Sequence, residues 1–139
     1  MSLLIIILLL IISGCSNKKV INYNYTFKGE NSFWTVEYNV NGKGTPTEKD
    51  EKISYEGNAS EKLTVTYKKS LSELSSAKHL LISYKSGSSE GNISQYSPRE
   101  KTYTLEPNSS GGITEIDKII KVNINIDGKP QIIELKKVQ

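Results

Sequence analysis

Hydrophobic and polar side chains alternate along most of the chain. One clear case runs from residue 34 to residue 40, where Trp34, Val36, Tyr38 and Val40 are separated by Thr35, Glu37 and Asn39. A period of two puts every second side chain on the same side of an extended backbone, and therefore predicts a half-buried strand. The same alternation predicts strands at 23–27, 53–55, 63–67, 80–84, 103–105, 120–126 and 133–135.

Short strands separated by turn residues predict an all-β domain with an antiparallel sheet. We expect a β-sandwich, with an immunoglobulin-like arrangement first and a small barrel second. Asp127-Gly128, between two alternating runs, is typical of a tight β-hairpin. Further turns are predicted at Asn41-Gly42, Gly57-Asn58, Gly87, Pro98, Pro107-Asn108 and Gly111-Gly112.

One segment has a helical pattern. Ser70 and Glu73 have the spacing of a capping box, in which the serine hydroxyl and the glutamate satisfy free amide groups at a helix start. Leu74 and Ala77 follow. The sequence therefore predicts one short connector helix, of about two turns, between two strands.

Length and charge limit the function classes. The 139 residues suffice for one domain, and eight tyrosines against two phenylalanines favour half-buried strand positions. The net charge is +3, from 18 Lys and Arg against 15 Asp and Glu. Because the basic residues are scattered along the chain and form no block, the sequence does not indicate nucleic-acid binding.

The chain starts with an apolar run that has the length of a signal-peptide core. Leu3 to Ile12 are ten consecutive Leu and Ile residues, whereas a helix needs about 20 apolar residues to span a bilayer. Ile12-Ser13-Gly14-Cys15 follows, and this tetrapeptide resembles the lipobox of bacterial lipoproteins. The alternative interpretations are a hydrophobic N-terminal strand and an uncleaved anchor with an incidental cysteine.

The lipobox resemblance implies a chemistry for Cys15, the single cysteine of the chain. In that family the thiol is alkylated by a diacylglyceryl group, and a peptidase cuts between the residues that correspond to Gly14 and Cys15. We therefore expect a signal peptide at 1–14, a lipidated cysteine and tether at 15–19, and one domain at 20–139. The expected location is the extracytoplasmic face of a bacterial cell envelope, with the protein held on the membrane through its lipid anchor.

One segment of the sequence matches the consensus of a serine-hydrolase motif. Gly87-Ser88-Ser89-Glu90-Gly91 fits G-x-S-x-G, in which a strand-to-helix turn exposes the serine beside a histidine base. Pro98 makes the following segment a poor helix, and His79, the only histidine, precedes the serine instead of following it. We expect a hairpin loop here.

A second segment matches the consensus of a calcium-binding loop, and this match is closer than that to the serine-hydrolase motif. Four residues with oxygen-bearing side chains and one glycine fall at positions one, three, five, six and twelve of an EF-hand-like loop: Asn123, Asn125, Asp127, Gly128 and Glu134. The flanks alternate like strands, whereas an EF-hand requires helices. A β-hairpin is therefore the favoured interpretation, and we expect no metal and no cofactor.

Trp34, the sole tryptophan, has two interpretations: a platform on which a ligand stacks, or a core residue of the domain. The chain as a whole resembles the small uncharacterised lipoproteins of low-GC bacteria, a resemblance that implies no activity. We expect a non-catalytic binding or structural module for an envelope protein or wall polymer. The alternatives are an immunity or inhibitor protein and, less favoured, an envelope hydrolase using Glu37, Asp50 and Glu100.

Overall fold

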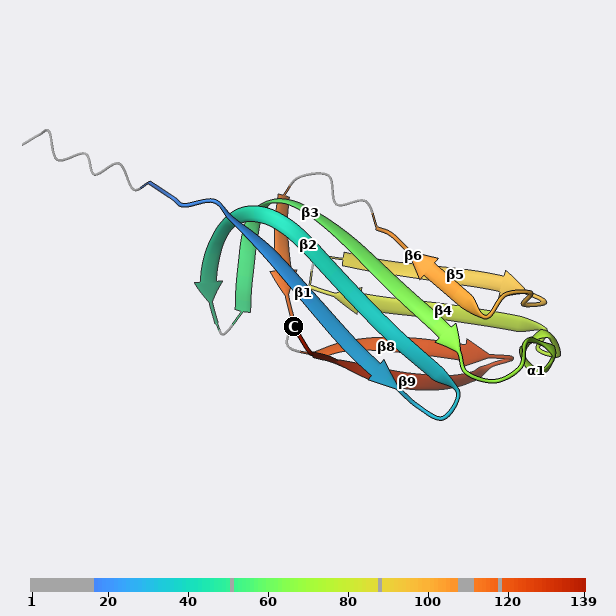
Figure 1. The fold of residues 1–139 in the computed structure, drawn as a ribbon. Helices are drawn as coiled ribbons and strands as arrows, with labels where there is room; N and C mark the ends of the chain where they lie inside the picture. Colours follow the sequence, from blue (N-terminus) through green and yellow to red (C-terminus); the bar gives the residue numbers. More distant parts are fainter. Residues whose placement is uncertain (1–16, 51, 88, 108–111, 118) are drawn as a thin grey trace, which may run out of the picture.

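The computed structural model describes residues 17–50, 52–87, 89–107, 112–117 and 119–139. Within these residues the chain forms nine strands and one short helix (Figure 1). In chain order they are β1 (Ile21–Glu30), β2 (Trp34–Lys49), β3 (Lys52–Tyr67), α1 (Leu71–Ser75), β4 (His79–Ser86), β5 (Ser89–Tyr96), β6 (Thr102–Leu105), β7 (Gly112–Ile116), β8 (Ile119–Ile126) and β9 (Lys129–Lys137).

All nine strands belong to one antiparallel sheet. The strand order is β5-β4-β8-β9-β1-β2-β3-β6, and β7 pairs with a separate stretch of β3. The sheet curves until it is nearly closed into a barrel, with β5 and β6 as its two free edges. The all-β prediction is confirmed, and the closure follows the small barrel that we named second. β1, β2 and β3 are consecutive neighbours, which is not the immunoglobulin-like order that we named first.

The sheet consists of two lobes that join at a narrow seam. The first lobe contains β1, β2, β3, β6 and β7, and the second contains β4, β5, β8 and β9. Between the lobes, β1 and β9 pair only through Phe27 with Lys137 and Lys28 with Lys136. The C-terminal residues extend this seam, because the Val138 amide donates to the Thr26 carbonyl at 2.8 Å.

The inward faces of both lobes form one hydrophobic core. The alternation predicted from the sequence places Trp34, Val36, Tyr38 and Val40 inside, each at most 2% exposed. The second lobe contributes inward residues of the same kind, among them Leu80, Ile82, Val122, Ile124, Ile133 and Leu135. Burial of these side chains, at roughly 1.5–3 kcal/mol each, is the main source of the barrel's stability.

The predicted helix and hairpin are both confirmed. The Ser70 hydroxyl accepts a hydrogen bond from the Glu73 amide, and α1 buries Leu74 against the core. At the β8–β9 turn, Asp127 and Gly128 have φ values of 50° and 82°. Two successive positive φ values fit a type I′ turn, whose twist matches that of the strands that it joins.

Two predicted turns are wrong. Asn41-Gly42 and Gly57-Asn58 lie inside β2 and β3, which pair with each other through these positions. The glycine at position 42 has a packing reason, because a side chain there would collide with the Tyr23 ring. That ring stacks on Tyr55, with centroids 3.8 Å apart. A glycine that makes room for an aromatic ring cannot be distinguished by sequence from a glycine that makes a turn.

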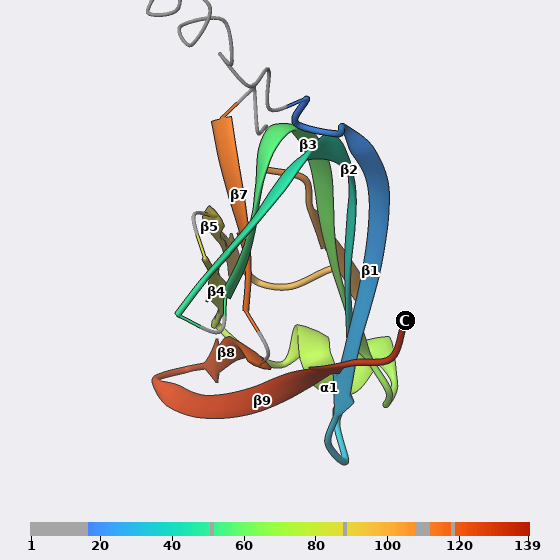
Figure 2. The same cartoon turned by 90° about the vertical axis from the view of Figure 1, so that its left-hand side faces the viewer.

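The start of the described chain and the β1–β2 turn lie at opposite ends of the molecule (Figures 1 and 2). We call the end with the β1–β2 turn the far end. It carries the turn residues 31–33, α1, His79 at the start of β4, Tyr96 at the end of β5, and the Asp127-Gly128 turn. A hydrogen bond of 3.0 Å from Asn31 Nδ2 to Gln131 Oε1 ties β1 and β9 together here.

Candidate functional site

Cys15 and Gly14 lie outside the described residues, so lipidation at Cys15 stays a prediction. The nearest described residues, 17–20, are exposed and precede β1. Among the helices of the described ranges, none has the length and apolarity needed to cross a membrane.

Trp34 is a core residue and not a ligand platform. Its side chain is 0% exposed, and its ring lies 4.8 Å from the ring of Tyr67. The platform interpretation is therefore wrong for Trp34. The residue starts β2 with its side chain on the inward face, where its large ring is part of the hydrophobic core.

The calcium-loop residues follow a hairpin and do not converge on one point. Asn125 Oδ1 accepts from the Gly128 amide at 2.8 Å, and Asp127 Oδ1 accepts from the amides of Lys78 and His79 at 2.9 and 2.8 Å. Glu134 forms an ion pair with Lys121. Asn123 lies on the same strand as Asn125, so the hairpin itself accounts for the spacing of these oxygen-bearing side chains.

The hydrolase-like residues are also separated. Ser89 starts β5 and His79 pairs with Tyr96 at its other end, so seven residue steps of extended strand, about 23 Å, separate the serine from the histidine. The Ser89 hydroxyl instead donates to the carboxylate of Glu61, which is 5% exposed. Ser89 therefore satisfies a buried acceptor, and the segment after it is a strand and not a helix.

The three scattered carboxylates occupy three different places. Glu37 is on the outward side of β2, Asp50 follows the end of β2, and Glu100 lies between β5 and β6. Glu37 bonds to Asn39 and pairs with Lys28, and these two contacts hold the pKa of its carboxyl below the usual range. Since these carboxylates do not converge, they form no acid–base pair.

Around Glu61 the barrel interior is polar. Tyr38 and Tyr84 are buried beside each other, with ring centroids 5.5 Å apart, and their hydroxyls form no hydrogen bond within the described ranges. Burial, together with the negative charge of Glu61, raises the pKa of Tyr84 to about 12. The ion pairs of the described residues do not include Glu61. This cluster is buried inside the barrel and presents almost no surface to a ligand.

The outward side of the first lobe bears a hollow of about 560 Å³. We call this side, made by the outward residues of β1, β2, β3 and β6, the first face. Its polar groups bond to one another: Thr26 donates to Asn39, Asn39 donates to Glu37, and Lys28 pairs with Glu37. The hollow is lined by Lys28, Gly29, Glu30, Thr35, Val36, Glu37, Thr64 and Thr66.

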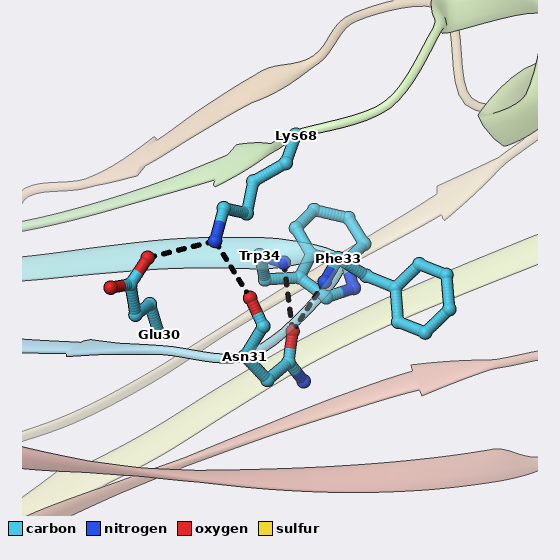
Figure 3. Close-up of polar contacts among 5 residues, drawn as sticks. All are labelled: Glu30, Asn31, Phe33, Trp34 and Lys68. Atoms are coloured by element: carbon cyan, nitrogen blue, oxygen red, sulfur yellow. Dashed lines mark hydrogen bonds and ion pairs between the residues drawn. The ribbon is translucent and has the colours of Figure 1, made fainter.

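The turn beside the hollow is held by a similar network (Figure 3). Asn31 Oδ1 accepts from the amides of Phe33 and Trp34, each at 2.8 Å. Lys68 Nζ donates to Glu30 Oε2 and to the Asn31 carbonyl. The Phe33 ring points away from these contacts and is 41% exposed. This network orders the turn and leaves one aromatic side chain in solvent.

The second lobe presents an aromatic pair at the far end. The Tyr96 side chain, 74% exposed, stacks on the His79 ring with centroids 4.6 Å apart and planes 24° from parallel. His79 is fixed from three directions: its amide donates to Asp127 Oδ1, its carbonyl accepts from the Asp127 amide, and its Nε2 lies 2.7 Å from Ser94 Oγ. Tyr96 is therefore an ordered aromatic ring in contact with water.

Uncharged polar residues continue from this pair along the outward side of β4, β5 and β8. We call this side the second face and define it by His79, Ser83, Asn92, Ser94, Tyr96, Asn123 and Asn125, with the half-buried Leu81 between Ser94 and Asn125. Within the described residues, the side chains of Ser83, Asn92 and Asn123 form no hydrogen bond, and Asn123 Oδ1 is buried without a partner. The side chains of Ser83 and Asn92 can therefore bond to a ligand or to water, whereas the protein covers Asn123 Oδ1.

Sequence reasoning missed Tyr96 because it missed β5. The segment 89–96 has one strongly apolar residue, Ile93, so the alternation with Gly91 and Gln95 is weak.

A comparison of the chain with protein-family models, with curated proteins and with solved structures found no match.

Proposed function

We propose that this protein is a bacterial cell-envelope lipoprotein whose β-barrel is a non-catalytic binding module. The lipid on Cys15 anchors the chain, and the far end and second face contact an envelope component. The proposal combines the lipobox-like Ile12-Ser13-Gly14-Cys15 with one structural observation, which is that the described chain starts at the end opposite to Tyr96 and Phe33.

That observation supports presentation away from the membrane. β1 runs from Ile21 to Glu30, about 30 Å at the rise of an extended strand, before the chain reaches the far end. A lipid at Cys15 lies only six residues before β1. An anchored barrel would therefore hold its start near the bilayer and its far-end turns farther out, where exposed aromatic side chains meet other envelope components.

Membrane fractionation of cells that express the full chain or the Cys15→Ala variant tests the anchor. We expect the natural chain in the membrane fraction, with the mass of two acyl chains and a glyceryl group on its new N-terminus. The variant should remain as uncleaved precursor or leave the membrane fraction. A Cys15→Ala chain that is still cleaved and still membrane-bound would refute the anchor.

Affinity capture from envelope extract tests the binding module. The bait is residues 17–139, which contain every described strand and core residue. We expect a component that is retained by this bait and lost when Tyr96 is changed to Ala. Retention that depends on the first-face hollow instead, for example on Thr64, would move the binding surface to the other lobe. Turnover of the captured component would contradict the non-catalytic role.

A further inference from the structure

The second face has the chemistry of a sugar-binding surface. We propose that it binds a glycan, with one pyranose ring stacked on Tyr96 and the neighbouring sugar hydroxyls bonded to Ser94, Asn92 and Ser83. This inference deepens the proposed function, because it names the ligand class for a module that the anchor would hold beside the envelope's polysaccharides.

The aromatic platform is the first requirement for sugar binding. The C–H side of a pyranose ring packs on an aromatic face, which must be exposed and held in one orientation. Tyr96 meets both conditions, because its side chain is 74% exposed and one side of its ring stacks on His79. His79 is in turn fixed by Asp127 and Ser94, so little rotational freedom remains to be lost when a ligand binds.

The polar rows supply the second requirement, which is hydrogen bonding without charge. Asn92, Ser94 and Tyr96 point to the same side of β5 at alternate positions, so the row spans about 13 Å. Ser83 lies opposite Asn92 on β4, and Asn123 lies opposite Ser83 on β8. Serine hydroxyls and asparagine amides both donate and accept, which matches the sugar hydroxyls that also do both.

Charge favours a neutral glycan over a charged polymer. The next row toward the N-terminal end contains Glu90, Lys85, Lys121 and Glu134, in which the two acidic and two basic groups balance. On the first face, by contrast, the polar side chains that line the hollow are largely engaged in ion pairs and in bonds to each other. A sugar there would have to displace existing contacts, whereas on the second face Ser83 and Asn92 have no protein partner to give up, and the Ser94 hydroxyl would bond to the sugar beside its contact with His79.

Titration of residues 17–139 with N,N′,N″-triacetylchitotriose, a soluble amino-sugar oligomer, tests the proposal by calorimetry. We expect saturable binding that Tyr96→Ala weakens about tenfold, which corresponds to the loss of about 1.4 kcal/mol. Tyr96→Phe keeps the ring and should stay within about threefold of the natural chain. Val138→Ala is the control, since Val138 is also an exposed apolar residue but lies at the seam beside Thr26, outside the far end and the second face, and it should bind unchanged.

Equal binding by the natural chain and Tyr96→Ala would overturn the proposal, and so would the absence of binding to this oligomer and to isolated cell-wall glycan. Thermal unfolding of each variant shows whether a loss of binding reflects a loss of fold. If Cys15 anchors the chain but no glycan binds, the result supports the proposed lipoprotein and contradicts the proposed sugar ligand. A captured protein that depends on Tyr96, without glycan binding, would also overturn the ligand class.

Discussion

The two outward faces of the barrel differ in how they use similar side chains. Both bear asparagine and hydroxyl side chains at alternate strand positions, with threonine prominent on the first face and serine on the second. On the first face, Thr26, Asn39, Glu37 and Lys28 form a continuous chain of hydrogen bonds and an ion pair. On the second face, Ser83, Asn92 and Asn123 make no such bonds within the described residues. The first face therefore stabilises itself, and the second is available to a ligand.

The amino-acid composition of a face therefore does not by itself identify it as a binding surface. A polar side chain that bonds to its neighbours contributes roughly 0.5–1.5 kcal/mol to folding, and a ligand must break that bond before it can use the group. A polar group without a protein partner exchanges only water for the ligand, so no bond within the protein is lost. The first face bears a hollow of about 560 Å³, yet its charged lining groups are paired.

The largest expected effect concerns the turn that supports the second face. Asp127→Ala should lower the free energy of unfolding by about 2 kcal/mol, because the amides of Lys78 and His79 lose their acceptor and alanine must adopt a positive φ. Urea unfolding measures the loss. Asp127→Asn is the control, since asparagine keeps an acceptor oxygen and tolerates this φ. Equal stability of the two variants would show that the contacts of Asp127 do not hold the turn.

A matched pair of asparagines tests the comparison itself. Asn39→Ala removes the hydrogen bonds to Thr26 and Glu37 on the first face and should cost about 1 kcal/mol. Asn92→Ala, on the second face, removes no such bond and should change stability by less than about 0.5 kcal/mol. Chemical denaturation of both variants under the same conditions checks this ordering. A larger loss for Asn92→Ala would reverse the assignment of the two faces.

A smaller effect should depend on pH. The hydrogen bond from Asn39, followed by the contact with Lys28, lowers the pKa of Glu37 in the folded chain. Its contribution is therefore present above the unfolded-state pKa of about 4.3 and is lost as the pH falls through the folded-state pKa. Because the pair is solvent-exposed, Glu37→Gln should cost only about 0.5 kcal/mol at pH 7. Unfolding curves of the two chains should converge in acid, and a pH-independent difference would contradict this origin.

The sequence predicts this fold where one strong pattern decides the local structure. The alternation from Trp34 to Val40, the Ser70 cap and the Asp127-Gly128 turn each depend on neighbouring residues, and the structure confirms all three. Gly42 was misassigned because its role is to admit the Tyr23 ring from another strand. Such a contact between distant segments leaves no local pattern in the sequence.

The candidate site was less predictable, for the same reason. The Tyr96 ring stacks on His79, which lies seventeen positions earlier in the sequence. The His79 amide in turn bonds to Asp127 in the neighbouring β8–β9 turn. For Trp34 the sequence left a ligand platform and a core residue as alternatives, and its place on the inward face of β2 makes it a core residue. Whether a polar group is already bonded depends on the partner across the sheet, which strand pairing determines and a single sequence does not reveal.

The difference between the two faces can be tested most directly by mapping amide shifts of ¹⁵N-labelled residues 17–139 during titration with triacetylchitotriose. The account predicts that shifts concentrate on the second face, at the backbone amides around Tyr96 and Ser94 and the side-chain amides of Asn92 and Asn123. The first-face amide of Asn39 should stay unchanged. Shifts that cluster around Asn39 and the hollow, with Asn92 unaffected, would contradict it.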